Sequence, residues 1–261
     1  MRNGDGSLQS VTRALRTLEL VGEAGELGVT ELSQRLEVHK ATASRLAATL
    51  AERGFLERDP TSGRYRLGFG LIGLAGAAMA GLDLVRLTRP ALEELANRTR
   101  ETVNLGVRSG GAVVYLDQVT GTRSIVTVNW VGRRAPLHGT SNGKVLLAFM
   151  DEAERDRLLS QPLERSTPHT IVDPDELRAQ LDAVRARGYA QTLEELEEGL
   201  NAVAAPVRQA DGEVVAAISV SGPAFRMRAV DLPRMARLAI DAAAAASGRL
   251  GYVERRRIAG A

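Results

Sequence analysis

Two short helical patterns between Thr30 and Arg53 constrain the fold more than any other stretch of the chain. Thr30 is a favourable N-cap for the first helix, the second begins at about Lys40, and Gly54 is placed to end it. Residues 37–39 interrupt the pattern between the two. Apolar side chains recur at helical spacing in both helices: Leu32, Leu36, Leu46 and Leu50. Two helices joined by so short a break predict a helix-turn-helix.

The residues that follow predict a β-hairpin. Segments 55–58 and 64–67 are short runs of strand-forming residues, and a turn at 59–63 with proline and glycine separates them. A hairpin directly after a helix-turn-helix is a wing. We expect a further helix before these elements, capped by Ser7 or Ser10. The inward face of that helix is predicted to carry Val11, Leu15, Leu18 and Val21.

The second helix of the pair has side chains suited to reading DNA. No acidic residue occurs from Val38 to Ala51. Polar residues crowd its first turns: Lys40, Thr42, Ser44 and Arg45. The first residues of a recognition helix reach base edges in the major groove, where such side chains bond to bases or phosphates. Three arginines of the hairpin are expected to contact the phosphate backbone: Arg58, Arg64 and Arg66. The alternative is a small helical domain with a solvated polar face.

An uncharged stretch follows, from Leu67 to Leu82. It is rich in glycine and short for a membrane span, so we expect a helix that packs closely against a neighbour. Residues 68–73 match GxGxxG, the fingerprint of dinucleotide-binding loops. That fingerprint needs a buried parallel strand before it, whereas a charged segment precedes it here. We interpret the match as chance and expect no cofactor.

The rest of the chain alternates between strand and helix patterns. A helix is expected at 84–100, with Pro90 in its middle or at a restart. Strands are expected at 102–107, 112–117, 124–128, 202–207 and 214–221. Further helices are expected at 141–150, 152–160, 174–187 and from Leu232 to before Gly248. Antiparallel strands with helices beside them predict an α+β fold.

A ligand pocket is indicated at one helix start. A loop of small residues at 136–144 opens onto Ser141, where free helix amides and the helix dipole attract an anion. In strand 214–221 the pleat is predicted to turn four apolar side chains to one face: Val214, Ala216, Ile218 and Val220. The opposite face offers space and two hydroxyls to a ligand: Val215, Ala217, Ser219 and Ser221. The alternative is that both serines only bond to nearby backbone.

Composition sets outer limits. The chain has 261 residues, enough for two domains, and 25% charged residues, as in soluble globular proteins. Zero cysteines and three histidines exclude disulfides and leave little for a metal site, so no metal is expected. The lack of cysteine agrees with a reducing cytoplasm, where we expect the protein to act. The N-terminus is polar, without an apolar signal region, and no membrane partner is expected.

These patterns, with SVTRAL at 10–15, KATASR at 40–45 and GLNAVAAP at 199–206, resemble the IclR family of transcription regulators. The resemblance runs from about Ser7 to about Ala246. It implies a winged helix-turn-helix at 7–67, a linker helix at 68–83 and an effector-binding domain of the GAF-like α/β type at 84–250. It also implies a homo-oligomer, either a dimer or a dimer of dimers, with the linker helix contributing to dimer contacts.

The resemblance places a small organic acid between the 136–144 loop and the last strand. By position, the residues implied to bind it are Ser141, Asn142, Gly143, Leu200, Ala202, Ser219 and Ser221. Two positions depart from the family pattern, because many members carry cysteine in place of Ala202 and an acid in place of Thr192. The ligand of this chain is therefore expected to differ.

The resulting expectation is a DNA-binding repressor whose affinity for a double-stranded operator is modulated by a small carboxylate effector. A small-molecule hydrolase is the alternative, because His138, Ser141 and Ser219 are residue types of a catalytic triad. Residues 139–143 have the spacing GxSxG, but Ser141 stands at a predicted helix start, where a serine serves anion binding equally well. We therefore expect no catalytic residue and no enzymatic activity.

Overall fold

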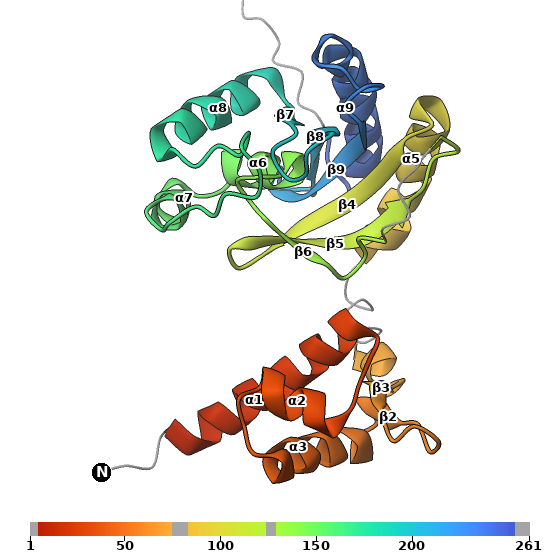
Figure 1. Cartoon of the computed structure of the whole chain (residues 1–261). Helices are drawn as coiled ribbons and strands as arrows, with labels where there is room; N and C mark the ends of the chain where they lie inside the picture. The colour runs from red at the N-terminus through yellow and green to blue at the C-terminus, as the bar shows by residue number, and fades with distance from the viewer. Residues whose placement is uncertain (1–4, 75–82, 124–128, 254–261) are drawn as a thin grey trace, which may run out of the picture. The chain divides into compact units, whose positions relative to one another are not determined.

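The structure is a computed structural model that describes residues 5–74, 83–123 and 129–253 (Figure 1). The chain divides into two compact units, Met1–Asp83 and Leu84–Ala261. Each unit has a hydrophobic core of its own. The separate linker helix predicted at 68–83 stays a prediction, because only residues 70–74 of it are described as helical and 75–82 lie outside the described part. The strand predicted at 124–128 lies outside it entirely.

The N-terminal unit is a winged helix-turn-helix, as predicted. Its elements are α1 (Asp5–Ala24), β1 (Glu26–Leu27), α2 (Val29–Arg35), α3 (Lys40–Glu52), β2 (Leu56–Arg58) and β3 (Tyr65–Leu67). The three strands form an antiparallel sheet in the order β1-β3-β2. The sequence did not predict β1, because two residues are too few to show the alternation of a strand.

Two predicted helix starts were wrong. Helix α1 begins at Asp5, so Ser7 and Ser10 lie inside it and neither is at its N-cap position. Helix α2 has Gly28 as its N-cap in place of Thr30. Glycine has no side chain to accept a hydrogen bond. Glu31, three residues on, instead supplies the reciprocal half of a capping box, because its Oε2 accepts the Gly28 amide at 2.8 Å.

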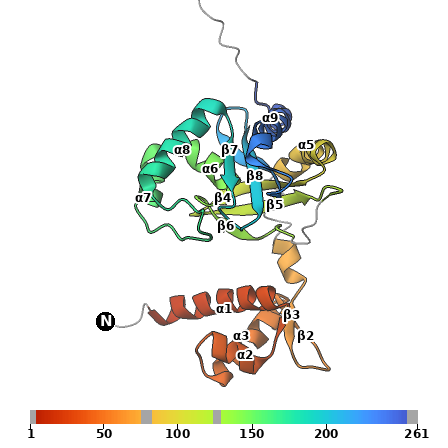
Figure 2. The ribbon, with the colours of Figure 1, turned by 45° about the horizontal axis from the view of Figure 1, so that its top comes forward.

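The inward face of α1 is also shorter than predicted. Val21 is buried and Leu18 packs on the core, but Val11 and Leu15 are each 58% exposed. The N-terminal half of α1 extends past α2 and α3 (Figure 2), so its apolar side chains find no core to enter. Helix periodicity predicted the apolar face of α1 but not how much of that face is buried.

The turn between α2 and α3 places Glu37 in the left-handed region, with φ of 51°. Helix α3 turns Ala43, Ala47 and Leu50 into the core and ends at Arg53, with Gly54 following at a φ of 73°.

The chain returns across this point after the hairpin. Gly68 donates its amide to Phe55 and Gly70 donates to the carbonyl of Gly54 at 2.9 Å. A Cβ on either residue would overlap Gly54, so close packing explains these glycines of the GxGxxG match.

The C-terminal unit is built on one six-stranded sheet in the order β6-β5-β4-β9-β8-β7, with every pairing antiparallel. Its strands are β4 (Thr102–Ser109), β5 (Ala112–Val119), β6 (Arg134–Pro136), β7 (Ala190–Leu193), β8 (Leu200–Arg208) and β9 (Val214–Pro223). Its helices are α5 (Asp83–Thr99), α6 (Ser141–Ala148), α7 (Glu152–Leu159), α8 (Pro174–Arg187), the 3-10 turn η1 (Ala229–Asp231) and α9 (Leu232–Arg249). The predicted α+β class is confirmed.

Helices cover both faces of this sheet (Figure 1). Helices α5 and α9 pack on one face, where Leu92, Val103 and Ile218 belong to one buried cluster. Helices α6 and α8 cover the other, where Val145 and Leu177 belong to a second cluster. The face under α6 and α8 is the one on which the polar cavity forms.

Three local predictions for this unit are decided by the structure. Pro90 lies within a continuous α5. Strands β6 and β7 were missed, because each has four residues or fewer. The predicted alternation of β9 holds from Ala216 to Ser221 but not for Val214 and Val215. Arg208 pairs with Val214 while Val207 pairs with Ala216, so Val215 is the extra residue of a β-bulge, which reverses the alternation.

Among the described residues, no helix is both long enough and apolar enough to span a membrane.

Candidate functional site

The exposed face of α3 carries the residues predicted to read DNA. Lys40, Ser44 and Arg45 are exposed, and Thr42 is half-buried. Lys40 and Arg45 form no ion pair or hydrogen bond with any other residue of the described part of the chain. Their charges are therefore free to meet a polyanion. Their position follows from the helix period, since Ala43 and Ala47 bury the opposite face.

The three wing arginines are not equivalent. Arg58 is exposed and lies 6.0 Å from the ring centre of Tyr65. Arg66 pairs with Glu57 on the facing strand at 3.1 Å. Arg64 is the most constrained, because it pairs with two glutamates, Glu26 at 2.9 Å and Glu31 at 2.9 Å.

Arg64 thus ties the wing to β1 and α2. The same Glu31 carboxylate accepts the Gly28 amide, and this bond, followed by Arg64, lowers the pKa of Glu31. Of the three, Arg58 is the arginine with no carboxylate partner among the described residues.

The C-terminal unit encloses a polar cavity of about 30 Å³ beside the start of α6. Its floor comes from β4, β8 and β9, and part of its rim from the connection between β7 and β8. It is lined by Asn104, Tyr115, Trp130, Thr140, Ser141, Thr192, Leu196, Leu200, Ala202, Ser219 and Ser221. Five of the seven residues that the resemblance implied are in this lining: Ser141, Leu200, Ala202, Ser219 and Ser221.

Open hydrogen-bonding groups face this cavity. Thr140 is the N-cap of α6, and its hydroxyl accepts the Gly143 amide at 3.0 Å. The amides of Ser141 and Asn142 donate to no described residue. Four lining hydroxyls likewise have no hydrogen bond to the described part of the chain: Ser141, Thr192, Ser219 and Ser221. The alternative in which the β9 serines only bond to nearby backbone therefore finds no support.

The other two implied residues lie just behind the cavity wall. Gly143 is buried, its amide is already taken by Thr140, and a Cβ on it would overlap the carbonyl of Leu137. Asn142 is fully buried, and neither atom of its amide group has a partner among the described residues. It lies against Gly106 of β4, where an added Cβ would be 2.6 Å from its Nδ2.

Among the described residues, no charged side chain lines the cavity. Burial raises the pKa of Tyr115 to about 12, and a hydrogen bond with Thr140 opposes that shift only in part. The phenol is therefore neutral at any ordinary pH. An adjoining cavity of about 90 Å³ shares Trp130, Leu200 and Ser221 with the first. It is also lined by acidic residues: Glu101, Glu197 and Glu198.

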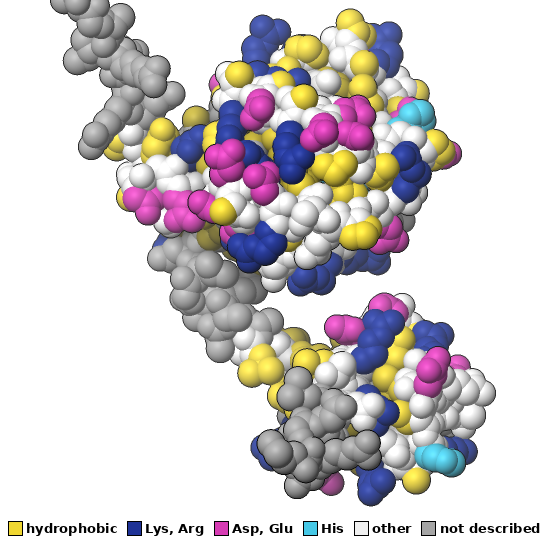
Figure 3. Space-filling view, turned by 90° about the vertical axis from the view of Figure 1, so that its left-hand side faces the viewer, with side chains coloured by type: hydrophobic (Ala, Val, Ile, Leu, Met, Phe, Trp, Pro, Cys, Tyr) yellow, Lys and Arg dark blue, Asp and Glu magenta, His cyan; other side chains and the backbone are white. Residues whose placement is uncertain are grey.

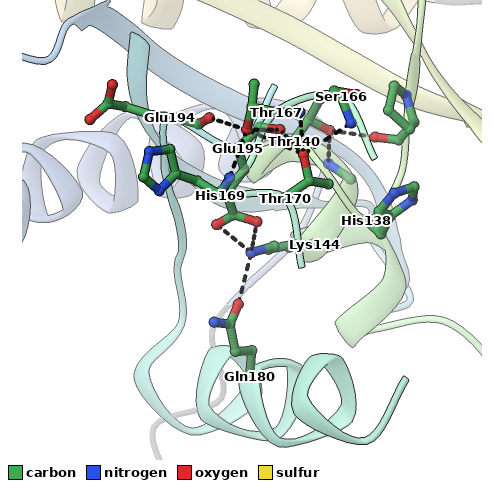
Figure 4. A network of polar contacts seen from close by, with 12 residues as sticks. His138, Thr140, Lys144, Ser166, Thr167, His169, Thr170, Gln180, Glu194 and Glu195 are labelled. Atoms are coloured by element: carbon green, nitrogen blue, oxygen red, sulfur yellow. Dashed lines mark hydrogen bonds and ion pairs between the residues drawn. The ribbon is translucent and has the colours of Figure 1, made fainter. Parts of the chain in front are cut away.

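A buried ion pair holds the β7–β8 connection against α6 (Figure 4). Lys144 Nζ contacts both carboxylate oxygens of Glu195, at 2.7 and 2.6 Å, and donates to Gln180 of α8 at 2.7 Å. The two charged side chains are 1% and 7% exposed. Burial lowers the pKa of Lys144 and raises that of Glu195, and their mutual attraction opposes both shifts.

Two threonines complete this attachment. Thr167 donates its hydroxyl to the carbonyl of Glu194 at 2.7 Å, and Thr170 donates to that of Glu195 at 2.6 Å. The side chains of Lys144, Thr167 and Thr170 thereby hold in place the segment that brings Leu196 and Leu200 to the cavity.

The triad alternative is not assembled. His138 Nε2 is 2.8 Å from the carbonyl oxygen of Glu164. No hydrogen bond joins this ring to Ser141 or Ser219 among the described residues. A serine without a base in reach is not an activated nucleophile.

Several lining residues were not predicted, namely Asn104, Tyr115, Trp130, Thr140 and Leu196. Asn104 carried a usable signal, since a lone amide between Val103 and Leu105 in a buried strand needs a partner. Trp130 and Leu196 gave none, because both come from irregular segments that only the tertiary fold brings to the cavity.

On the face of the C-terminal unit shown in Figure 3, basic and acidic side chains are interspersed. That face therefore has no continuous basic patch of the kind that binds nucleic acid. The winged helix, whose exposed helix carries no acid before Glu52, is joined to an antiparallel unit that encloses a cavity. Together they define a DNA-binding protein with a separate cavity-bearing domain.

Comparison with known proteins specifies the family. Residues 10–60 match the IclR helix-turn-helix domain, and residues 76–248 match the family described as bacterial transcriptional regulator IclR C-terminal. The chain belongs to the IclR family and is a DNA-binding transcriptional regulator, not an enzyme.

The chain is similar to relatives over most of their length. The HTH-type transcriptional regulator KdgR of Dickeya chrysanthemi is 37% identical over 247 residues, which cover 94% of this chain and 81% of that protein. The HTH-type transcriptional repressor AllR of Klebsiella pneumoniae is 33% identical over 221 residues, 84% of this chain and 81% of that protein. An IclR homolog from Microbacterium hydrocarbonoxydans, solved in complex with 4-hydroxybenzoate, is 29% identical with a TM-score of 0.81. That match covers 93% of this chain and 98% of that one.

Proposed function

We propose that this regulator is a repressor whose hold on its operator is controlled by a small carboxylate bound in the cavity at the start of α6. The observation that carries the proposal is the set of open donors there, the Ser141 and Asn142 amides and the hydroxyls of Ser219 and Ser221. A helix start favours an anion by about 0.3–1 kcal/mol, and each charge-assisted hydrogen bond adds more. No lining carboxylate repels it.

Two relatives support the proposal by analogy. The Microbacterium homolog was solved with 4-hydroxybenzoate, an organic acid, and the Klebsiella relative is a repressor. In this chain, Leu200 and Ala202 would form the apolar wall against the carbon skeleton of the ligand. Gly143 would act indirectly, by letting the start of α6 approach Leu137.

On the DNA side, α3 would enter the major groove and the wing would lie along the backbone. We propose that Lys40, Thr42, Ser44 and Arg45 supply the base contacts and Arg58 and Arg66 the phosphate contacts. One recognition helix covers too few base pairs for a specific site, so a homodimer on two half-sites is expected. Footprinting on an operator selected from random DNA, with sedimentation of the complex, tests this. A single unpaired half-site bound by a monomer would exclude it.

The sole tryptophan of the chain makes the ligand test direct. Trp130 lines both cavities, so its fluorescence reports on their occupancy. Small carboxylates are screened by this signal, and the acids that bind are then titrated into the protein–operator complex. For the ligand to control DNA binding, the two affinities must be coupled by about 1–3 kcal/mol.

The decisive variant is Ser219→Val, which replaces the hydroxyl with methyl groups that can neither donate nor accept a hydrogen bond. It should abolish the response to the acid and leave operator affinity unchanged. Thr88→Val is the matched control, because Thr88 is a buried hydroxyl on α5, on the opposite face of the sheet. An unaltered response in Ser219→Val would place the ligand elsewhere.

A further inference from the structure

We propose that Asn104 is the specificity-determining residue of this cavity and that it selects a short acid bearing a hydroxyl group. The inference rests on the proposed small-acid site and specifies the chemical class of its ligand.

The key atom is Asn104 Oδ1, which is buried and has no hydrogen-bond partner among the described residues, on a side chain that lines the cavity. Asn104 is only 4% exposed and lies on β4 directly opposite Ser219 of β9. A buried acceptor that has lost water and gained no donor is unfavourable, and native structures contain few of them. A ligand group that donates to this oxygen would therefore gain more than one placed elsewhere in the cavity.

The chemistry of the lining separates the two ends of the ligand. An amide oxygen can only accept, whereas the hydroxyls around it can donate or accept. A carboxylate can only accept, so it cannot satisfy Asn104 Oδ1 and suits the Ser141 and Asn142 amides instead. The donor for Asn104 must therefore be a second group on the same molecule. A hydroxyl fits better than an ammonium, because no acidic side chain lines this cavity to balance a positive charge.

The size of the cavity limits the rest of the molecule. A volume of about 30 Å³ holds roughly two water-sized groups. Even a two-carbon hydroxy acid has more non-hydrogen atoms than this, so acids of two or three carbons require the least widening of the cavity. A longer one has to extend past Trp130 and Leu200 into the adjoining 90 Å³ cavity, towards Glu197 and Glu198.

The experiment compares pairs of acids that differ by one hydroxyl: glycolate with acetate, lactate with propionate, and 4-hydroxybenzoate with benzoate. Binding to the full chain is followed by Trp130 fluorescence and by calorimetry. For the two short pairs, wild type should bind the hydroxy acid roughly tenfold or more tightly than its deoxy partner. The deoxy acid leaves Asn104 Oδ1 without a hydrogen bond. In Asn104→Leu that ratio should fall to within about twofold, with affinity for the deoxy acid retained.

Thr192→Val is the matched control. Thr192 lines the same cavity and is equally buried, at 4% exposed. It lies on β7, three strands from β4 in the sheet, so at about 4.8 Å per strand the two backbones are some 14 Å apart. This variant should keep the wild-type ratio of hydroxy-acid to deoxy-acid affinity, whatever it does to the affinity for both.

The outcomes are distinguishable. If acetate and propionate bind wild type as tightly as their hydroxy partners, the inference is overturned while the small-acid site stands, and no variant is needed to see it. A strong preference that survives Asn104→Leu would overturn the assignment to Asn104. Binding of only the aromatic pair would overturn the size limit. If no acid binds, the proposed function itself has failed.

Discussion

The two units of this regulator use charge in opposite ways. On α3, Lys40 and Arg45 stand exposed and free of ion pairs with described residues, ready for a polyanion. In the C-terminal unit, the cation nearest the start of α6, Lys144, is buried and bound to Glu195, and the cavity beside it has no charged lining. The first arrangement attracts phosphate at long range and weakens with salt. The second would recognise the proposed small acid through short, directional hydrogen bonds.

Under the proposed function, the cavity does not need a cation to attract an acid. A free lysine there would bind many anions with little regard to their shape, since Coulomb attraction is not directional. Amides and hydroxyls fixed on α6 and β9 bind tightly only a ligand whose polar atoms are placed to form hydrogen bonds with them. The lysine near that position is used instead to hold the cavity wall in place. Four experiments test this difference between the two units.

The largest effect is expected where a charge is buried. Lys144→Met leaves the Glu195 carboxylate 7% exposed and without its cation, which should destabilise the C-terminal unit by about 3–5 kcal/mol. Urea unfolding followed by Trp130 fluorescence measures it. The double variant Lys144→Met with Glu195→Leu should recover most of the loss, because no unpaired charge remains. A single variant as stable as wild type would show that the pair does not hold the wall.

Base reading by α3 comes next. Arg45→Ala should cost about 1–3 kcal/mol of operator affinity and relax the preference at the base it contacts. Arg53→Ala is the matched control, because Arg53 is an exposed arginine at the other end of the same helix. Binding to a library of single-base operator variants separates the two. Equal losses in both, uniform over all sequences, would mean that α3 contacts only phosphate.

The wing provides a smaller effect and an internal contrast. Arg58→Ala should reduce the slope of log affinity against log salt by about one, as expected for one lost phosphate contact. Arg64→Ala should leave that slope unchanged, because Arg64 is engaged by Glu26 and Glu31. These partners are about half exposed, so its loss should cost the N-terminal unit at most ~1 kcal/mol of stability. The opposite pattern of slopes would make Arg64 the phosphate contact.

The smallest effect concerns pH in the wing turn. Hydrogen bonds from the amides of Ser62 and then Thr61 lower the pKa of Asp59 below its ordinary value of 3.8. A lowered pKa means that this contribution is present above 3.8 and is lost as pH falls through the folded-state value. The Thr61 and Ser62 amide resonances should therefore shift together in that acid range. Asp59→Asn should abolish the shift, and its persistence in that variant would assign it to another group.

Much of the N-terminal unit could be predicted because its signals are local. The helix pair, the hairpin and the exposed positions of Lys40 and Arg45 follow from periodicity over a few turns and from turn residues. The wrong predictions for this unit concern the residues that each helix or strand contacts. Val11 and Leu15 obey the helix period but extend past the core, and the partners of Arg64 come from β1 and α2.

The longer helices and strands, and the face of β9 that carries Ser219 and Ser221, could be predicted from the sequence because they depend on spacing along the chain. What these faces meet is set by the tertiary structure. Lys144 and Glu195 are 51 residues apart, and Asn104 reaches Ser219 only because β4 pairs with β9. Such contacts depend on which strands become neighbours, and the free energy that selects them comes from burial summed over the whole unit. No short stretch of sequence contains that information.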